Sequence, residues 1–377
     1  MSSVTKSARD TNSLPLITKT PILSEGDPEA KREEIRQYFH DSFTLYESLF
    51  ECLASDDAFY ARANPLRHPL IFYYGHTSVF YINKMNVAKL IDERVAGDLE
   101  STLAIGVDEM SWDDLNENSY QWPTPAEVKA HRDKTRQIVD RFITECDCST
   151  PIGWDSPLWI VLMGIEHERI HLETSAVLMR ELPLEMLKPH PVWGRICTDS
   201  GSAPENELIA VTGGTVELGK PRTSELYGWD NEYGYFSTEV ADFKASKYLV
   251  SNQEFLEFVE SDGYLIRDFW TDEGWDWVQY RKAEYPVWWS KDDGTWKLRT
   301  TLELIDMPWD WPAEINYLEA KAFCNWKTKE TGTHVRMPTE AEWHQLRSSL
   351  DTDQPYWESA PGNLNLEGDM SPCPVTR

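Results

Sequence analysis

The sequence has no long apolar run and no apolar segment near its start. No stretch approaches the ~20 consecutive apolar residues that a membrane-spanning helix needs. The opening residues, MSSVTKSARDTNSLPLITKTPILSEG, lack the apolar core of a secretory signal. We therefore expect a cytoplasmic protein with no membrane partner, and a polar, flexible tail over residues 1–28.

Cysteine and basic side chains are also scarce. The six cysteines are irregularly spaced and form no CxxC pair, which argues against a thiolate zinc site and favours reduced thiols. Only 36 basic side chains stand against 64 acidic ones, for a formal net charge of -28. No local basic patch offsets this charge, which repels nucleic acid and anionic membranes. We expect no nucleic-acid partner.

The first half of the chain has helical periodicity. Apolar residues recur at helical spacing in four segments, roughly 29–54, 68–92, 124–146 and 157–182. Thr124 begins a capping box with proline at the first helical position, and Ser156-Pro157 opens the fourth segment in a similar way. Four helices of about 20 residues predict a four-helix bundle over residues 29–200, and bundle cores are common places for metal sites.

The second half differs in composition. Of the 17 tryptophans, 13 lie after residue 192, among clusters of Gly, Asp and Pro. Helical spacing is confined to stretches near 252–261, 313–329 and after Thr339. We expect a loop-rich domain over residues 207–377, held together by aromatic packing and preceded by the polar linker Thr198–Asn206. With the bundle before it, the chain is predicted to be of the α+β class.

The segment Gly164-Ile-Glu-His-Glu-Arg-Ile-His-Leu-Glu173 carries the clearest chemical signal. His167 and His171 are four residues apart, so on a helix they share one face and reach one ion. Their stripe is otherwise apolar, and His76 lies on a similar apolar stripe of the second predicted helix. Because both stripes face the core, we predict that the three histidines converge on one metal ion.

Glu173 belongs to the same segment but points elsewhere. At about 100° per residue it lies about 200° from His171 and about 120° from His167 around the helix. It shares its face with Glu166, Arg169 and Arg180, at the spacing of helical charge pairs. Two roles remain open for Glu173: a salt-bridged position on the surface, or a hydrogen bond to one of the metal-binding histidines.

Three neutral imidazoles suit zinc, copper or ferrous iron equally well. They leave coordination positions open, which is typical of a catalytic site rather than a structural one. The alternative is that all three are ordinary core or surface histidines, as we expect for the other six histidines of the chain. No further catalytic side chain is indicated.

Two sets of motifs resemble known families. His-x-x-x-His-x-Glu on the fourth helix, with an upstream histidine on the second, resembles the pattern of DinB-like bundles. The second half resembles the formylglycine-generating-enzyme/sulfatase-modifying-factor domain, whose fold is C-type-lectin-like. The matching segments are Thr212–Gly219, Asp230–Glu232, Leu249–Phe258 and Arg336–Trp343.

Fused in this order, the two modules resemble the iron-dependent sulfoxide synthases of thiol-histidine biosynthesis, over roughly residues 30–377. The resemblance implies an oxidoreductase in which His76, His167 and His171 hold Fe(II). It also implies small-molecule substrates: a cysteine thiol, an imidazole acceptor and O2. One branch joins cysteine or γ-glutamylcysteine to hercynine on the ergothioneine route, and the other joins cysteine to histidine on the ovothiol route. The segments Arg67–Lys84 and Tyr227–Gly234 look closer to the ovothiol branch.

The chain departs from this family near its end. Such domains continue through further Trp-rich motifs, whereas here Pro361-Gly-Asn-Leu-Asn-Leu366 is followed closely by Arg377. The methyltransferase domain that often follows in the ovothiol branch is also absent. We therefore expect a truncated chain that lacks part of its substrate pocket.

Two other functions fit the same histidines. Some DinB-like bundles use zinc to activate a thiolate for transfer, because zinc lowers the pKa of a bound thiol. Those enzymes need no Trp-rich domain, which argues against this alternative. A non-catalytic, metal-binding fragment is the other possibility.

Overall fold

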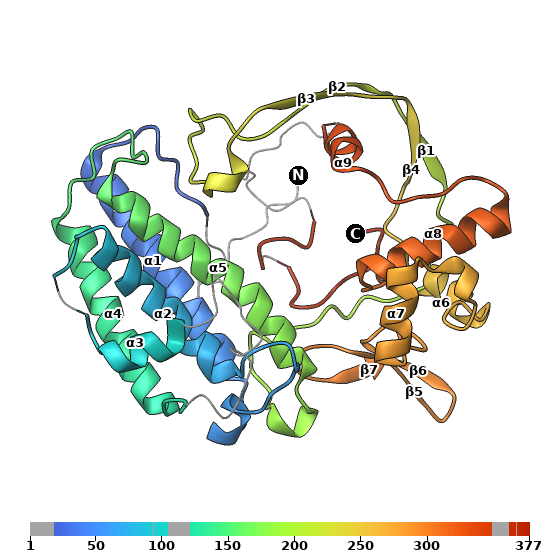
Figure 1. Cartoon of the computed structure of the whole chain (residues 1–377), viewed down its shortest axis with the longest axis horizontal. Helices are drawn as coiled ribbons and strands as arrows, with labels where there is room; N and C mark the ends of the chain where they lie inside the picture. Colours follow the sequence, from blue (N-terminus) through green and yellow to red (C-terminus); the bar gives the residue numbers. More distant parts are fainter. Residues whose placement is uncertain (1–18, 93, 105–120, 349–361, 367) are drawn as a thin grey trace, which may run out of the picture. The chain divides into compact units, whose positions relative to one another are not determined.

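The chain divides into two compact units in the computed structural model (Figure 1). The structure describes residues 19–92, 94–104, 121–348, 362–366 and 368–377. The helical unit is Met1–Trp193 with Thr223–Trp229, and the second unit is Gly194–Arg222 with Asp230–Arg377. No described helix combines the length and the low polarity of a membrane span.

The helical unit contains the four predicted long helices and one short helix that the sequence pattern missed. They are α1 (Pro28–Phe50), α2 (Leu70–Val87), α3 (Gly97–Ala104), α4 (Pro125–Glu145) and α5 (Pro157–Glu181), with single turns at Asp56–Phe59 and Leu184–Met186. The predicted capping box forms at Thr124 and Glu127, and the Ser156 side chain accepts from the Leu158 N–H. These caps satisfy backbone donors that have no partner within the helix.

α2 lies at the centre of the helical unit and packs against α3, α4 and α5, while α1 packs against α4 and α5 (Figure 1). Two glycines permit the closest approaches. A Cβ at Gly164 of α5 would lie 2.1 Å from the Tyr81 ring of α2, and one at Gly75 would lie 2.3 Å from Leu103 of α3. Both glycines lie within one turn of the histidines singled out above, so they set the spacing of the helices there.

Two short segments outside the helices complete the core of this unit. Tyr227 is buried against Trp159 of α5, with ring centroids 4.8 Å apart, and the Leu23 N–H donates to the Glu225 carbonyl at 2.7 Å. Residues 1–18 of the predicted tail lie outside the described residues. The described remainder of that tail places Leu23 in the apolar core.

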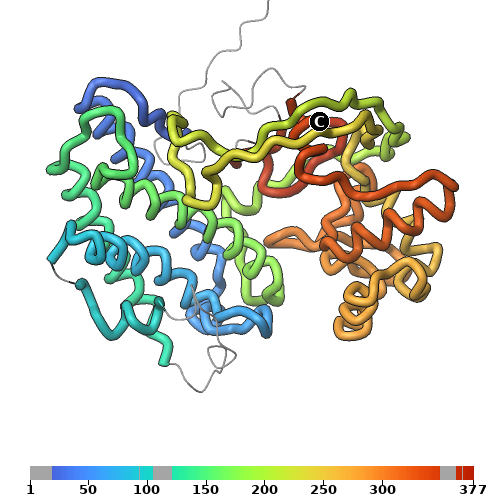
Figure 2. Tube along the Cα trace, turned by 45° about the horizontal axis from the view of Figure 1, so that its top comes forward, coloured from blue at the N-terminus to red at the C-terminus, as the bar shows by residue number. Residues whose placement is uncertain are grey.

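Within its described residues, the second unit holds three small antiparallel sheets, four α-helices and two single turns, at Asp230–Glu232 and Arg267–Phe269. β1 (Leu208–Val211) pairs with β4 (Phe243–Ser246), and β2 (Gly214–Leu218) pairs with β3 (Phe236–Val240). Figure 2 shows these two pairs of strands running side by side. The third sheet has the order β5-β6-β7, formed by Trp289–Asp292, Thr295–Arg299 and Leu304–Asp306. The helices are α6 (Asn252–Glu260), α7 (Asp272–Arg281), α8 (Tyr317–Thr331) and α9 (Glu340–Arg347). This unit is the predicted aromatic, loop-rich half of an α+β chain.

The sequence pattern was wrong about α7, which it assigned to a loop cluster. The Thr271 side chain accepts from the Gly274 N–H, and Asp272 and Glu273 lie in the first turn, where acidic residues favour a helix. Trp275 and Trp277 then pack on the core, which is built mainly from aromatic rings. The segment was predicted to be a loop because Asp, Gly and Trp are frequent in it, although it begins with an ordinary helix cap.

Candidate metal centre

The three predicted histidines come together on two neighbouring helices. His76 lies in the middle of α2, and His167 and His171 lie on α5, one turn apart. The Nε2 atoms of His76 and His167 are 3.3 Å apart, and those of His167 and His171 are 3.2 Å apart. The three ligand atoms all lie within 4.8 Å of one another. His76 and His167 are buried, and His171 is half-buried.

The His76–His167 and His167–His171 separations fit pairs of ligands on one ion. Two nitrogens held about 2.1 Å from a metal at 90–109° are about 3.0–3.4 Å apart. Hydrogen bonds alone do not account for the cluster. His76 Nδ1 donates to the Leu103 carbonyl at 2.8 Å, so in the neutral ring its Nε2 carries only a lone pair. One proton on His167 Nε2 cannot serve both neighbours, whereas a cation would satisfy all three nitrogens.

The His76–Leu103 contact also fixes which nitrogen of His76 faces the cluster. Ligating histidines typically donate their second ring nitrogen to a carbonyl or carboxylate, which orients the ring. Here the acceptor comes from α3, the short helix that the sequence pattern missed. α3 therefore contributes no ligand, yet it orients one.

His167 and His171 are held differently. The His167 ring stacks on Phe80, with centroids 3.7 Å apart, and its Nδ1 has no hydrogen-bond partner among the described residues. The His171 Nδ1 lies 3.4 Å from the Thr174 hydroxyl. Burial lowers the pKa of His167 well below its ordinary value and lowers that of His171 to about 3, with the neighbouring histidines adding to the effect. Both rings are therefore neutral at pH 7, the form that binds a metal.

Glu173 stands apart from this arrangement. It is exposed on α5, and among the described residues the candidate metal-holding group consists of the three histidines alone. On the face that Glu173 was predicted to share, Glu166 accepts from the Tyr38 hydroxyl at 2.5 Å and Arg169 lies over the Tyr38 ring. Among the described residues, the cluster thus offers three imidazole nitrogens and no carboxylate.

Sequence reasoning missed a buried polar network beside the cluster. Arg132 of α4 and Glu168 of α5 are both fully buried and lie 2.7 Å apart. His131, expected to be ordinary, is buried between Ser78 and Glu100, at 3.0 and 3.4 Å. The available signal was Glu168, since a carboxylate in the apolar stripe of a helix requires a buried partner.

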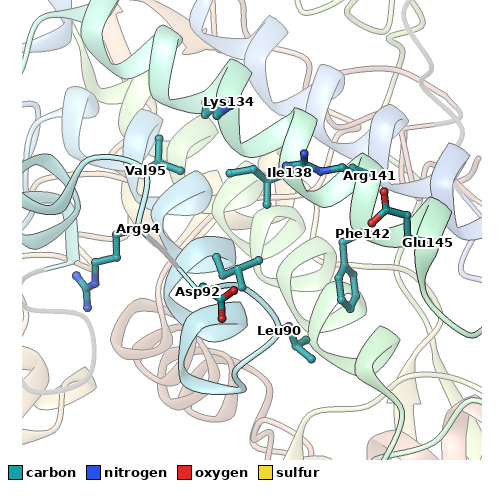
Figure 3. A pocket seen from close by; sticks show the side chains of 10 residues that line it. Leu90, Asp92, Arg94, Val95, Lys134, Ile138, Arg141, Phe142 and Glu145 are labelled. Atoms are coloured by element: carbon teal, nitrogen blue, oxygen red, sulfur yellow. The ribbon is translucent and has the colours of Figure 1, made fainter.

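A cavity of about 690 Å³ lies elsewhere in the helical unit (Figure 3). Its walls come from α4 and from the segment that follows α2. Charged and apolar side chains both line it, namely Asp92, Arg94, Lys134, Arg141 and Glu145 together with Leu90, Ile91, Val95, Ile138 and Phe142. None of the three histidines lines this cavity.

Comparison with protein families matches both units. Residues 38–175, which contain all three histidines, match the DinB superfamily. Residues 197–364 match the sulfatase-modifying factor enzyme 1-like domain. The chain joins these two domains. This order, bundle first and Trp-rich domain second, is the one predicted from the motifs.

Three relatives match between about half and four fifths of the chain. The chain is 29% identical to hercynine oxygenase of Mycolicibacterium thermoresistibile, over 56% of this chain and 47% of that protein. It is 32% identical to hercynine oxygenase of Mycolicibacterium smegmatis, over 51% of this chain and 42% of that protein. It is 22% identical to ergothioneine biosynthesis protein 1 of Schizosaccharomyces pombe, over 81% of this chain and 40% of that protein. The chain thus spans less than half the length of these relatives.

Proposed function

We propose that the DinB domain of this chain binds one ferrous ion at His76, His167 and His171, as part of a sulfoxide synthase. In the proposed reaction a cysteine thiol, an imidazole C–H and O2 yield a sulfoxide with a new C–S bond and one molecule of water. Oxygen accepts four electrons, two from forming the C–S bond and two from oxidising the sulfur. The observation that carries the proposal is the convergence of the three Nε2 atoms, two of them on buried rings and one on a half-buried ring.

The residues of the cluster suit this chemistry in two ways. The neutral rings of His167 and His171 need lose no proton before binding a metal at pH 7. No described carboxylate joins the group, so a thiolate substrate would meet no fixed negative charge from a ligand. Bound Fe(II) would supply the electron transfer that couples reduction of O2 to oxidation of the thiol.

The imidazole acceptor is histidine or its trimethylated betaine, hercynine. The names of the relatives favour hercynine, because two of them are hercynine oxygenases. The sequence segments Arg67–Lys84 and Tyr227–Gly234 favour histidine, which would make the protein a 5-histidylcysteine sulfoxide synthase of the ovothiol route. Both acceptors present the same ring, and they differ at the amine.

The test is mass spectrometry of products from protein purified and loaded with Fe(II) without oxygen. Histidine or hercynine is supplied with cysteine or γ-glutamylcysteine, and O2 is then admitted. A sulfoxide product with either acceptor supports the proposal, and the acceptor that reacts identifies the branch. Iron bound without any product would favour the non-catalytic, metal-binding alternative.

Zinc-dependent thiol transfer is a second candidate, because three neutral imidazoles suit zinc as well as iron. Metal analysis of protein prepared without added metal separates the two. Zinc at one equivalent, with thiol transfer that continues without O2, would overturn the iron proposal.

A further inference from the structure

α4 supplies no histidine to the cluster, yet two of its buried polar residues contact α2, and one of them, Arg132, also contacts α5. His131 is 3% exposed and Arg132 is fully buried. Their partners on α2 and α5 include the residues that directly follow His76 and His167 in the sequence. α4 is therefore placed to control how these two ligands are held.

Arg132 links α2 and α5 at the level of the ligands. One terminal nitrogen donates to the Thr77 hydroxyl at 2.8 Å and to the Tyr74 carbonyl at 2.9 Å, and the other donates to Glu168 at 2.7 Å. The Thr77 hydroxyl donates to the same Glu168 oxygen at 3.1 Å. Thr77 follows His76 and Glu168 follows His167, so one planar guanidinium fixes the separation of the two helices.

The guanidinium is also held by residues of α1. Its Nε donates to Glu47 of α1 at 2.9 Å, and its plane lies 4.1 Å from the centroid of the Phe43 ring. Arg136, one turn further along α4, donates to the other oxygen of Glu47 at 2.9 Å and also lies over Phe43. Arg136 shares the packing of Arg132 against α1, but its described contacts do not reach α2 or α5.

His131 acts on His76 indirectly, through α3, whose Leu103 carbonyl accepts from the His76 ring. It lies between Ser78 of α2 and Glu100 of α3. Glu100 accepts from the N–H groups of Val95 and Ala96 at 2.8 and 2.9 Å, which secures the start of α3. The other end of α3 presents the Leu103 carbonyl to His76.

We propose that Arg132, supported by His131, positions the metal ligands, so that the affinity and the coordination geometry of the metal depend on it. This inference rests on the proposed metal site at the three histidines. Arg132 touches no ligand atom and acts through Thr77, Glu168 and the helices that carry them. Residues that orient ligands from behind typically contribute about 10- to 100-fold to metal affinity.

Titration with Co(II) as the probe tests this, because its visible absorption bands report both occupancy and geometry. Arg132→Met is compared with Arg136→Met, a matched control on the same helix with the same partner, Glu47. We expect Arg132→Met to weaken Co(II) binding about 10- to 100-fold and to shift the absorption bands. Arg136→Met should leave the bands unchanged and the affinity within about twofold of the wild type, since its described contacts avoid both ligand helices.

A second variant covers the case in which Arg132→Met does not fold, as judged by far-UV circular dichroism. Thr77→Val keeps the Arg132–Glu168 ion pair and the Arg132 bond to the Tyr74 carbonyl, and it removes the hydroxyl that bonds both members of the pair beside His76. It should shift the Co(II) bands in the same direction as Arg132→Met. Folded Arg132→Met or Thr77→Val protein with the spectrum and affinity of Arg136→Met would overturn the positioning role. Wild-type protein that binds no Co(II) would instead overturn the metal site itself.

Discussion

The two units bury different kinds of side chain. The helical unit buries charged groups in its interior, with Glu100, Arg132 and Glu168 all fully buried. The second unit is built around aromatic rings such as Trp311 and Trp326, which are 1% and 4% exposed. Buried charges are costly unless each is paired, so a core that contains them is held in one arrangement. An aromatic core contributes stability through the apolar surface area that it buries, and its side chains do not each need a partner of opposite charge.

This difference indicates where the chemistry lies. In the second unit the described buried carboxylates mostly serve helix caps: Glu319 accepts from the Asn316 N–H, and Glu342 accepts from the Thr339 N–H. In the helical unit the buried Arg132 links α4 to α1, α2 and α5, and its partner Glu168 directly follows His167 in the sequence. We therefore expect substitutions in the second unit to change stability, and substitutions in the helical unit to change metal binding as well.

The largest expected effect on stability comes from the aromatic core. Trp311→Ala should destabilise the second unit by about 3–5 kcal/mol, the usual cost of removing a buried tryptophan. Its indole N–H donates to the Asp199 carbonyl, so that acceptor also loses its partner. Calorimetry on the metal-loaded protein should show the transition of the second unit at lower temperature. If folded Trp311→Ala protein binds Fe(II) tenfold more weakly than the wild type, the second unit does more than contribute stability, and the contrast between the units is wrong.

The largest expected effect on metal binding comes from the cluster. His167→Ala removes the central histidine, whose Nε2 lies next to both others, and should weaken Fe(II) binding by more than about 100-fold. His40→Ala is the control, because His40 bonds Asp140 at 2.6 Å and lies outside the cluster. Anaerobic equilibrium dialysis measures both. Equal affinity in the two variants would remove the basis for the site.

The units should also lose stability in acid over different pH ranges. Burial lowers the pKa of His131, so the unfolded chain takes up a proton near pH 6.5 that the folded unit resists. Stability from this group is present above about pH 6.5 and is lost as the pH falls below that value. In the second unit, Arg336 lowers the pKa of Glu342 to about 2, so its contribution is lost only as the pH falls from about 4.3 towards 2.

Denaturant unfolding followed at several pH values checks this order. Between pH 7 and 5 the helical unit of the wild type should lose more stability than that of His131→Gln, which carries no titrating group at this position. Glu342→Gln should alter the profile only below about pH 4.3. If His131→Gln and the wild type show the same slope between pH 7 and 5, the assignment of the acid sensitivity to His131 is wrong.

The smallest expected effect belongs to Glu173. Glu173→Gln should leave Fe(II) affinity within about twofold of the wild type, because the residue is exposed and outside the cluster. Dialysis against the same iron buffer measures this. A tenfold loss would show that Glu173 supports a ligand, and the three-histidine description would then be incomplete.

Periodicity and capping were sufficient to predict the bundle. Helical spacing located the four long helices, and Thr124 and Ser156 marked the starts of two of them. The relative positions of His76, His167 and His171 followed from the apolar stripes they share. Local rules succeed here because each long helix is amphipathic and begins with its own cap.

The supports of the site could not be predicted in the same way. α3 is eight residues long, too short for a periodic signal, although its Leu103 carbonyl orients His76. Arg132 reads as one more surface charge on α4, and its burial depends on Glu47, Thr77 and Glu168 from three other helices. The return of Thr223–Trp229 to the helical unit is equally a tertiary effect. Contacts between residues far apart in the sequence cannot be predicted from the spacing of residues within one helix.

The central claim is that one iron ion lies among the Nε2 atoms of His76, His167 and His171. The most direct measurement is a crystal structure of protein loaded with one equivalent of Fe(II) without oxygen, with anomalous difference density recorded at the iron edge. We predict a single peak in the helical unit, about 2.1 Å from each of the three nitrogens. A peak at any other position, or none in protein that retains its iron, would contradict the claim.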